Sequence, residues 1–301
     1  MELRQLKYFV MSAEYLNFSE AAKHLFITQS TLSQQIKQLE FELGFPLFLR
    51  NSRHIVLTEA GEEFLPFARK TIRDAEDGVQ RLYDLQNVKA GTLRVGVTYS
   101  LSSVLTEGLL SFMRQYPNVK LEICYETVNR LLELLKARKL DFVLSYKPLV
   151  DTPEIDTISL FENSLSAVVS STHAMASMKG ITLEELCGYP LVLPSKELQA
   201  RMMLDRLMQG KGFTLASQVE LNETNILLQM VATGNYITVL SASAVFGNSR
   251  FKAVPLKEPG NRMVASMLTL KGAYQKASAK EFISILLDTD AVKRRAVIIS
   301  D

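Results

Sequence analysis

Apolar positions recur at helical spacing over the first sixty residues of the chain. One stripe of side chains advances by four, three and four positions: Leu32, Ile36, Leu39 and Leu43. Side chains at that spacing share one face of an α-helix, for which Thr28 is a candidate cap and Gly44 the stop. A shorter helix over 20–25, capped by Ser19, precedes it, and a first helix spans 2–14. The pattern predicts three helices, the last two joined by a tight turn.

Two short helices joined by a tight turn form the helix-turn-helix plan. The face opposite the apolar stripe carries hydroxyl, amide and ammonium groups. Together with the capping threonine they are candidate DNA contacts: Thr28, Gln29, Ser30, Thr31, Ser33, Gln34 and Lys37. Gln bonds an adenine edge twice, hydroxyls donate or accept, and Lys reaches phosphate or guanine. A plain helical hairpin with a solvated polar face is the alternative that periodicity leaves open.

The segment 50–56 has the pattern of a small hairpin with Asn51 and Ser52 as its turn. Such a hairpin forms a wing beside the helices. It would bring Arg50 or Arg53 near the DNA backbone or the minor groove, so both are further candidate DNA contacts.

A long helical pattern runs from 58 to about 88, with Pro66 inside it. We expect Pro66 to bend the first part of this helix. The apolar stripe persists for about eight turns at 3.6 residues per turn. A small wing domain cannot bury a stripe of that length, so the stripe needs another chain or the next domain. Packing only within the protomer is the alternative.

After Gly91 the pattern changes to short apolar runs that alternate with helical stripes. A first series predicts strands and helices in turn: 93–97, 103–116, 119–125, 129–139 and 141–146. This alternation is typical of a parallel sheet with right-handed crossovers. A second series repeats it: strands 165–170, 191–193, 218–221 and 237–240, with helices after Thr182, over 198–209 and over 226–232.

A late strand over 263–269 and a terminal helix capped by Ser278 are left over. We therefore expect two α/β lobes, with the chain crossing between them near 160–163 and 264–268. The predicted domains are these: a DNA-binding domain 1–58, a linker helix 59–90 and an α/β domain 91–301, whose lobe one is 92–162 with 267–301 and whose lobe two is 163–266.

Polar side chains follow several predicted strands, at the sheet edge where open parallel sheets bind ligands and helix N-termini offer free N–H groups. The candidates in lobe one are Thr98, Ser100, Ser102, Asn129, Tyr146 and Lys147. The candidates in lobe two are Ser195, Lys196, Asn222 and Thr224. We expect all ten to face the groove between the lobes and to bind a small organic molecule, with a small carboxylate favoured. Helix capping is the alternative for each.

The N-terminal stretch closely resembles the winged helix-turn-helix of the LysR-type transcriptional regulators. A gapless pattern carries the resemblance: Ala21, Ala22, Leu25, Gln29, Ser30, Leu32, Ser33, Ile36, Leu39, Glu40, Leu43, Gly44, Leu47, Phe48, Arg50, Arg53, Leu57, Thr58, Ala60 and Gly61. Ser30 departs from the family, in which many members have Pro. The resemblance implies a linker helix that pairs two protomers, and an effector domain of the periplasmic-binding-protein type, type 2.

The resemblance also implies partners. They are double-stranded DNA with an interrupted inverted repeat, a small-molecule effector, a second protomer, a tetramer built from two dimers, and RNA polymerase. The two DNA-binding domains of such a dimer would bind half-sites about one helical turn (~10 bp) or more apart.

Composition adds limits to this picture. A chain with 47% hydrophobic and 22% charged residues is an ordinary globular protein. The net charge is only +2, so the DNA argument depends on where the basic residues lie. No run approaches the roughly 20 apolar residues of a membrane span, and no secretory signal is visible. We expect a cytoplasmic protein with no membrane partner.

No catalytic signature appears in the sequence, and we expect neither a cofactor nor a metal. The two cysteines, Cys124 and Cys187, cannot form a full zinc site. Two buried small hydrophobes are favoured over a redox pair. The leading hypothesis is an allosteric transcription factor. An enzyme on a two-lobed fold and a solute carrier are the alternatives.

Overall fold

The structure is a computed structural model that describes residues 1–50, 55–85, 91–150, 152–289 and 292–293. The chain divides into two compact units, 1–87 and 88–301. The predicted turn at Asn51 and Ser52, the candidate DNA contact Arg53 and the predicted boundary at 87–90 lie outside the described residues. The bounds of the three predicted domains stay a prediction.

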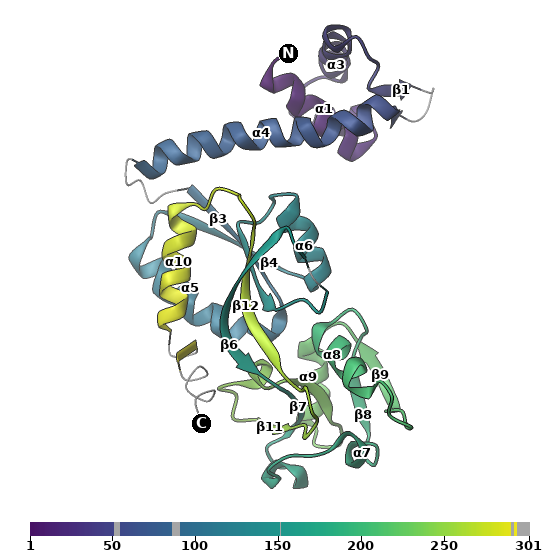
Figure 1. The fold of residues 1–301 in the computed structure, drawn as a ribbon, viewed down its shortest axis with the longest axis vertical. Helices are drawn as coiled ribbons and strands as arrows, with labels where there is room; N and C mark the ends of the chain where they lie inside the picture. The colour runs from purple at the N-terminus through teal and green to yellow at the C-terminus, as the bar shows by residue number, and fades with distance from the viewer. Residues whose placement is uncertain (51–54, 86–90, 151, 290–291, 294–301) are drawn as a thin grey trace. The chain divides into compact units, whose positions relative to one another are not determined.

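The first unit begins with three helices, α1 (Leu3–Tyr15), α2 (Phe18–His24) and α3 (Gln29–Leu43) (Figure 1). The prediction for α3 is confirmed, with Thr28 as its cap and Gly44 at its end, where φ is 76°. The predicted cap of α2 is wrong. Asn17 caps this helix, and its Oδ1 accepts from the N–H groups of Ser19 and Glu20 at 2.9 and 3.2 Å. The helix starts two residues early because Phe18 is buried in its first turn.

The core of the first unit collects one face of each helix. Its buried apolar side chains include Leu6, Phe9, Ala21, Ala22, Leu32, Ile36 and Leu39. Leu3, in the first turn of α1, is exposed. The predicted wing hairpin is confirmed as β1 (Phe48–Arg50), paired antiparallel with β2 (Ile55–Leu57). The Glu40 carboxylate fixes the approach to β1, because it accepts from the N–H groups of Leu47 and Phe48 at 2.9 and 3.1 Å.

The long helix α4 (Glu59–Leu85) follows, capped by Thr58, whose hydroxyl accepts from the Gly61 N–H at 3.0 Å. The helix continues through Pro66, and the predicted bend stays a prediction. Ala68 is buried against the helical core, but further along the stripe Val79 and Leu82 are 53% and 63% exposed. These exposed side chains are the apolar surface for which the sequence predicted another covering element.

Lobe one of the second unit is a five-stranded sheet in the order β4-β3-β5-β12-β6. The strands β3 (Gly91–Val97), β4 (Val119–Tyr125) and β5 (Phe142–Tyr146) are parallel, as predicted. Figure 1 shows α5 (Ser102–Gln115) and α10 (Ala277–Asp288) on one side of the sheet and α6 (Val128–Lys136) on the other. Side chains alternate accordingly along β5: Phe142 packs on Phe282 of α10, and Val143 faces the α6 side.

Two long strands connect the lobes, as predicted. They are β6 (Ile155–Asn163) and β12 (Met263–Leu270), which pair antiparallel along their length (Figure 1). The predicted cap of α10 is wrong, because Lys276 takes the N-cap position and makes no capping bond. Lys276 instead donates from Nζ to Asp141 at 3.0 Å, which ties α10 to the start of β5.

Lobe two has β7 (Leu165–Ser170) at its centre, antiparallel to β10 (Thr238–Ser241) and to β11 (Phe251–Pro255). A parallel pair, β8 (Leu191–Pro194) and β9 (Ser217–Leu221), completes it. The prediction of a second parallel sheet is therefore wrong at β7, and β11 was not predicted. The alternation of strands and helices does not reveal direction here, because β7 continues from a connecting strand and not from a crossover helix.

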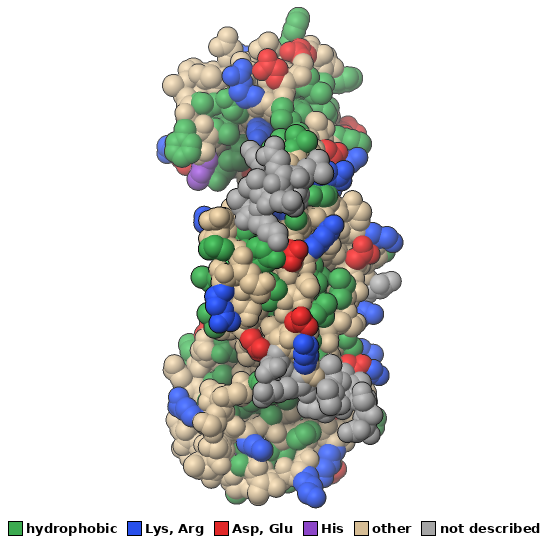
Figure 2. Space-filling model, turned by 90° about the vertical axis from the view of Figure 1, so that its left-hand side faces the viewer, with side chains coloured by type: hydrophobic (Ala, Val, Ile, Leu, Met, Phe, Trp, Pro, Cys, Tyr) green, Lys and Arg blue, Asp and Glu red, His purple; other side chains and the backbone are tan. Residues whose placement is uncertain are grey.

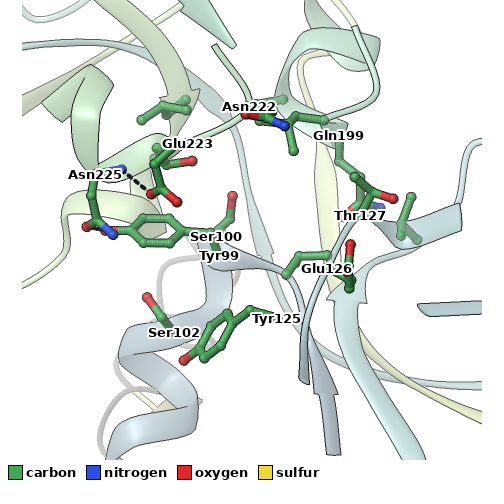
Figure 3. Close-up of a pocket in the computed structure, with 16 residues that line it drawn as sticks. Tyr99, Ser100, Ser102, Tyr125, Glu126, Thr127, Gln199, Asn222, Glu223 and Asn225 are labelled. Atoms are coloured by element: carbon green, nitrogen blue, oxygen red, sulfur yellow. Dashed lines mark hydrogen bonds between the residues drawn. The ribbon is translucent and has the colours of Figure 1, made fainter. Parts of the chain in front are cut away.

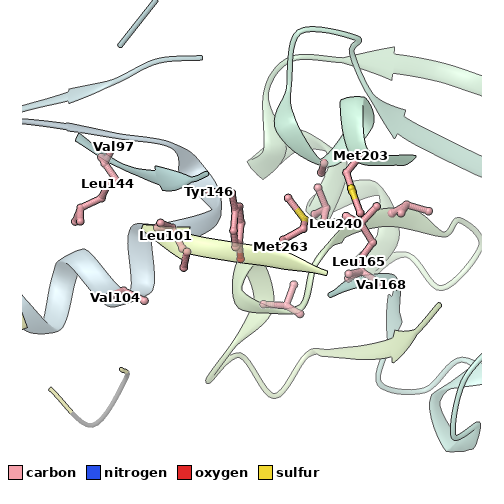
Figure 4. Close-up of a cluster of buried hydrophobic side chains, with 14 of the residues drawn as sticks. Val97, Leu101, Val104, Leu144, Tyr146, Leu165, Val168, Met203, Leu240 and Met263 are labelled. Carbon is pink, nitrogen blue, oxygen red and sulfur yellow. The ribbon is translucent and has the colours of Figure 1, made fainter. Parts of the chain in front are cut away.

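Three helices cover lobe two: α7 (Leu183–Leu186), α8 (Gln199–Met208) and α9 (Thr224–Ala232). The predicted capping box of α7 is confirmed between Thr182 and Glu185. The buried cluster in Figure 4 runs from Leu101 and Tyr146 of lobe one, past Met263 of β12, to Met203 and Leu240 of lobe two. The two lobes thus share one apolar core.

Candidate functional site

The candidate DNA-binding face lies on α3. Thr28, Gln29, Ser30, Thr31, Gln34 and Lys37 are exposed, and Ser33 is half-buried. The Thr28 hydroxyl lies 2.9 Å from that of Ser30 and 2.8 Å from that of Thr31, so three hydroxyls gather at the helix start. In the part of the first unit that the structure describes, Gln29, Gln34 and Lys37 make no side-chain hydrogen bond or ion pair, and they are available to a partner. Arg50 belongs to β1, but its side chain is outside the described set.

Figure 2 shows Lys and Arg side chains interspersed with Asp and Glu on the face it presents, without a large field of one sign. With a net charge of only +2, any binding of DNA by α3 depends on where its polar groups lie and not on bulk charge.

A cavity of about 470 Å³ lies between the lobes of the second unit. Five of the ten predicted effector residues line it: Thr98, Ser100, Ser102, Asn222 and Thr224. The first three follow β3, and the last two follow β9. Figure 3 shows Ser100 and Ser102 on the lobe-one side, with Asn222 across the cavity. We call this space the first cavity.

Four helices begin at the first cavity, namely α5, α6, α8 and α9. Thr127 caps α6 and Glu223 caps α9 through their side chains, but α5 and α8 have no side-chain cap. The first N–H groups of a helix have no partner within it and carry partial positive charge. The cavity therefore offers backbone donors to an anionic or polar ligand group.

Thr98 gives the sharpest sign of a ligand site. Its side chain is buried, with 8% of the residue exposed, and its hydroxyl has no hydrogen-bond partner. Leaving a buried hydroxyl unpaired costs about 1–3 kcal/mol. Thr98 lines the first cavity at the end of β3, where a bound molecule would supply the partner.

The charged side chains of the first cavity are both acidic. Glu126 and Glu223 line it, and no Lys or Arg belongs to its described lining. The Tyr99 hydroxyl donates to Asn225 Oδ1 at 2.6 Å and so joins lobe one to lobe two. Burial, with smaller effects from Glu223 and Tyr125, raises the pKa of Tyr99, so its phenol stays neutral and a donor at physiological pH.

Seven polar lining residues are not among the ten candidates: Tyr99, Tyr125, Glu126, Thr127, Gln199, Glu223 and Asn225. Glu126 directly follows a predicted strand, and Glu223 lies between the candidates Asn222 and Thr224 after another, so the rule that selected their neighbours would have found them too. No local signal marks Gln199, because it reaches the cavity from the first turn of α8.

The prediction that all ten residues face one groove is wrong. Asn129, Tyr146 and Lys147 line a separate second cavity of about 540 Å³. The physical reason is Gln199, which lines both cavities and occupies the groove between them. Ser195 and Lys196 line neither cavity, and the Ser195 hydroxyl pairs instead with Glu197 at 2.9 Å.

The expectation of two buried cysteines is also wrong. Cys187 is exposed and Cys124 is half-buried. Burial raises the pKa of the Cys124 thiol, and the nearby Glu126 carboxylate raises it further. The thiol form of Cys124 is therefore favoured over the reactive thiolate.

Two family models match this sequence. Residues 3–62 match the bacterial regulatory helix-turn-helix protein, lysR family, and residues 86–291 match the LysR substrate binding domain. The chain belongs to the LysR family. This LysR-type protein is 31% identical over 285 residues to YybE of Bacillus subtilis, an uncharacterized HTH-type transcriptional regulator, with 94% of this chain and 97% of YybE covered.

Solved structures share the fold. A full-length OxyR variant from Pseudomonas aeruginosa is 23% identical, with a TM-score of 0.69 over 99% of this chain and 96% of that one. Full-length CbnR in complex with its target DNA is 23% identical, with a TM-score of 0.54 over 98% of this chain and 100% of that one.

Membership of the family establishes the general function. The LysR-type regulator is a DNA-binding protein of transcription, with a helix-turn-helix head followed by a substrate-binding effector domain. Within the described residues no helix has both the length and the hydropathy needed to span a membrane.

Proposed function

We propose that this LysR-type regulator switches transcription when a small organic effector binds in the first cavity. The observation that carries the proposal is the buried, unpartnered hydroxyl of Thr98 in a cavity where four helices begin. The protein acts as a switch and not as a catalyst, in line with the relatives named as transcriptional regulators. We place its action in the cytoplasm.

The DNA-binding half of the proposal rests on three exposed side chains of α3, Gln29, Gln34 and Lys37. Gln29 and Gln34 would contact base edges, and Lys37 would contact phosphate or a guanine edge. The exposed Val79 and Leu82 of α4 suit pairing of two protomers through a linker helix over 59–90. Two paired heads over 1–58 would read an interrupted inverted repeat. Tetramer formation and contact with RNA polymerase are parts of the proposal that rest on the family resemblance.

The chemistry of the first cavity favours an effector that carries two opposite charges. A carboxylate would meet the N-termini of α5 and α8 and the hydroxyls of Thr98, Ser100 and Ser102. The described lining of the first cavity offers that carboxylate no cationic side chain. Its two glutamates, Glu126 and Glu223, would instead bind an ammonium group. The proposed carboxylate effector is therefore a zwitterion of the amino-acid type. A volume of about 470 Å³ suits a molecule of that class.

The proposed switch depends on the fact that both lobes contribute side chains to the first cavity. Ser100 and Ser102 belong to lobe one, and Asn222 and Thr224 to lobe two, within the effector domain 91–301. A ligand that bonds both sets favours the lobe spacing in which both reach it. It shifts the regulator between states only by its difference in affinity for them.

A thermal-shift series on the purified protein tests the proposal, with a dye readout because the chain has no Trp. Each amino acid is compared with the matching acid that lacks the amine and the matching amine that lacks the carboxyl. An effector present at about 100 times its dissociation constant raises the free energy of unfolding by about 2.7 kcal/mol. We expect a saturable rise for a zwitterion that neither truncated compound reproduces.

Ser102→Phe, which fills the first cavity, should abolish the rise, and Ser249→Phe at an exposed loop serine should leave it intact. A rise that survives Ser102→Phe would refute the site. A rise given by the acid without the amine would keep the site and refute the zwitterion.

A further inference from the structure

The second cavity has the build of a ligand site. It lies between α6, the residues 147–150 and Thr152 that follow β5, α8 and the start of β12. Its floor is apolar and buried, and consists of Val128, Leu132, Met203 and Met263. Its volume of about 540 Å³ falls in the usual range of small-molecule sites, roughly 300–1,000 Å³.

The charge of the second cavity is opposite to that of the first. Lys147, Arg206 and Arg262 line it, and no Asp or Glu belongs to its described lining. Arg262 pairs with Glu162 of β6. Lys147 and Arg206 have no carboxylate partner among the residues that the structure describes. Two cations at the rim of an apolar cavity are suited to an anionic head group.

The mouth of the second cavity exposes apolar side chains. Leu149 and Val150, in the segment after β5, are 44% and 72% exposed. Met202 of α8 is half-buried on the wall, and a methionine side chain adapts to ligands of different shape. An apolar molecule in the cavity would cover part of this surface.

We propose that the second cavity binds an organic anion with an apolar body, such as an aromatic or medium-chain carboxylate, independently of the first cavity. The carboxylate lies at the rim between Lys147 and Arg206. The apolar body lies against Leu132, Met203 and Met263 on the floor. The proposal does not depend on the zwitterionic effector, because the two cavities differ in lining charge and share only Gln199 and Val128.

Titration calorimetry on the full chain tests this site with 3-phenylpropionate and octanoate as probes. Acetate is the anion without an apolar body, and 3-phenylpropanamide is the neutral analogue of the first probe. We expect at least one probe to bind with a dissociation constant below about 10 mM, and the amide at least about tenfold more weakly than 3-phenylpropionate. Acetate should give no saturable heat. Failure of both probes to bind, or equal affinity for acid and amide, would overturn the proposal.

Variants locate the binding. Arg206→Gln and Lys147→Gln should each raise the dissociation constant of the probe at least about fivefold, because each removes one positive charge from the rim. Lys252→Gln is the matched control, since Lys252 is exposed on β11 and lines neither cavity. Unchanged affinity in both rim variants would refute the assigned anion site.

Met202→Trp fills the second cavity and should block the probe, and Ser102→Phe in the first cavity should not. The reverse result would place the probe in the first cavity and overturn the proposal. Thermal midpoints of all variants show whether each is folded. Because Ser102→Phe is also the test of the proposed effector site, failure of one site is distinguishable from failure of the other.

Discussion

The side-chain amide of Gln199 exchanges two hydrogen bonds with the backbone of Tyr146. Gln199 Nε2 donates to the Tyr146 carbonyl at 2.6 Å, and the Tyr146 N–H donates to Gln199 Oε1 at 3.2 Å. Gln199 begins α8 in lobe two, and Tyr146 ends β5 in lobe one. This pair of bonds therefore ties the lobes together at the boundary between the two cavities.

Gln199→Ala should destabilise the second unit and merge the cavities. The N–H and the carbonyl of Tyr146 would each lose one hydrogen bond, although the carbonyl keeps the one from the Ser145 hydroxyl at 2.8 Å. We expect a cost of about 1–3 kcal/mol in the free energy of unfolding. Gln199→Glu keeps the acceptor but loses the donor to the Tyr146 carbonyl, so it should also destabilise. Denaturant unfolding measures both, with Gln229→Ala on the exposed side of α9 as the control. Equal stability of Gln199→Ala and the control would show that the bonds contribute nothing.

Two glycines of α4 should respond in opposite ways to alanine. A Cβ at Gly61 would lie 2.2 Å from the Leu47 carbonyl oxygen, and one at Gly78 would meet nothing within 4 Å. Gly61→Ala should destabilise the first unit by about 1–3 kcal/mol or more, because backbone must move. Gly78→Ala should stabilise it by about 0.5–1 kcal/mol, because alanine favours the helix. Thermal midpoints of the pair check this, and a neutral Gly61→Ala would contradict the tight contact.

Substitutions on α3 should separate base reading from phosphate contact. Gln34→Ala should cost about 1–3 kcal/mol at the preferred sequence and relax the choice of base there. Lys37→Ala should weaken binding to all sequences alike and lower the salt slope by about one if Lys37 contacts phosphate. Selection from random DNA, followed by titrations at several salt concentrations, measures both effects. Unaltered sequence preference in both variants would contradict the assignment of α3 to the DNA.

The same experiment tests Arg53, for which the sequence predicted general phosphate or minor-groove contact. Arg53→Ala should weaken binding to all sequences. If Gln34→Ala and Arg53→Ala changed only effector affinity, the assignment of the DNA-binding head would be wrong.

Glu258 should make the second unit sensitive to acid. Burial raises the pKa of this carboxyl, but the Leu183 N–H and the Lys211 ammonium, at 2.9 and 2.7 Å, lower it more, so the pKa falls below its ordinary 4.5. The stabilisation is thus fully present above about pH 4.5 and is lost as the pH falls through the folded-state pKa. Glu258→Gln should be less stable than the wild type at pH 7, with the difference shrinking below pH 4.5. Thermal midpoints from pH 7 to pH 3 measure it, and a pH-independent difference would contradict the linkage.

Periodicity and end signals were enough for much of the fold. The stripe from Leu32 to Leu43 predicted α3 because its burial and its caps agree. The connecting strands were predicted because β12 was left over after two complete series of strands and helices. The cap of α2 was misplaced because Asn17 and Ser19 are both good caps, and only the burial of Phe18 decides between them.

The site was less predictable than the fold. Strand ends correctly brought Thr98, Ser100 and Ser102 together with residues of lobe two. The division into two cavities depends on Gln199, whose contact with Tyr146 spans 53 positions and leaves no local pattern. The charge of each cavity could not be predicted either, because it depends on which charged side chains the folded chain brings to its lining.

The most direct test of the central claim measures DNA affinity with and without a ligand of the first cavity, and ligand affinity with and without DNA. Linkage requires the two factors to be equal. We predict that the two factors are equal to each other and different from one. In the Ser102→Phe variant both effects should disappear, although the variant should still bind DNA. A ligand that occupies the first cavity but leaves both affinities unchanged would contradict control of DNA binding from this site.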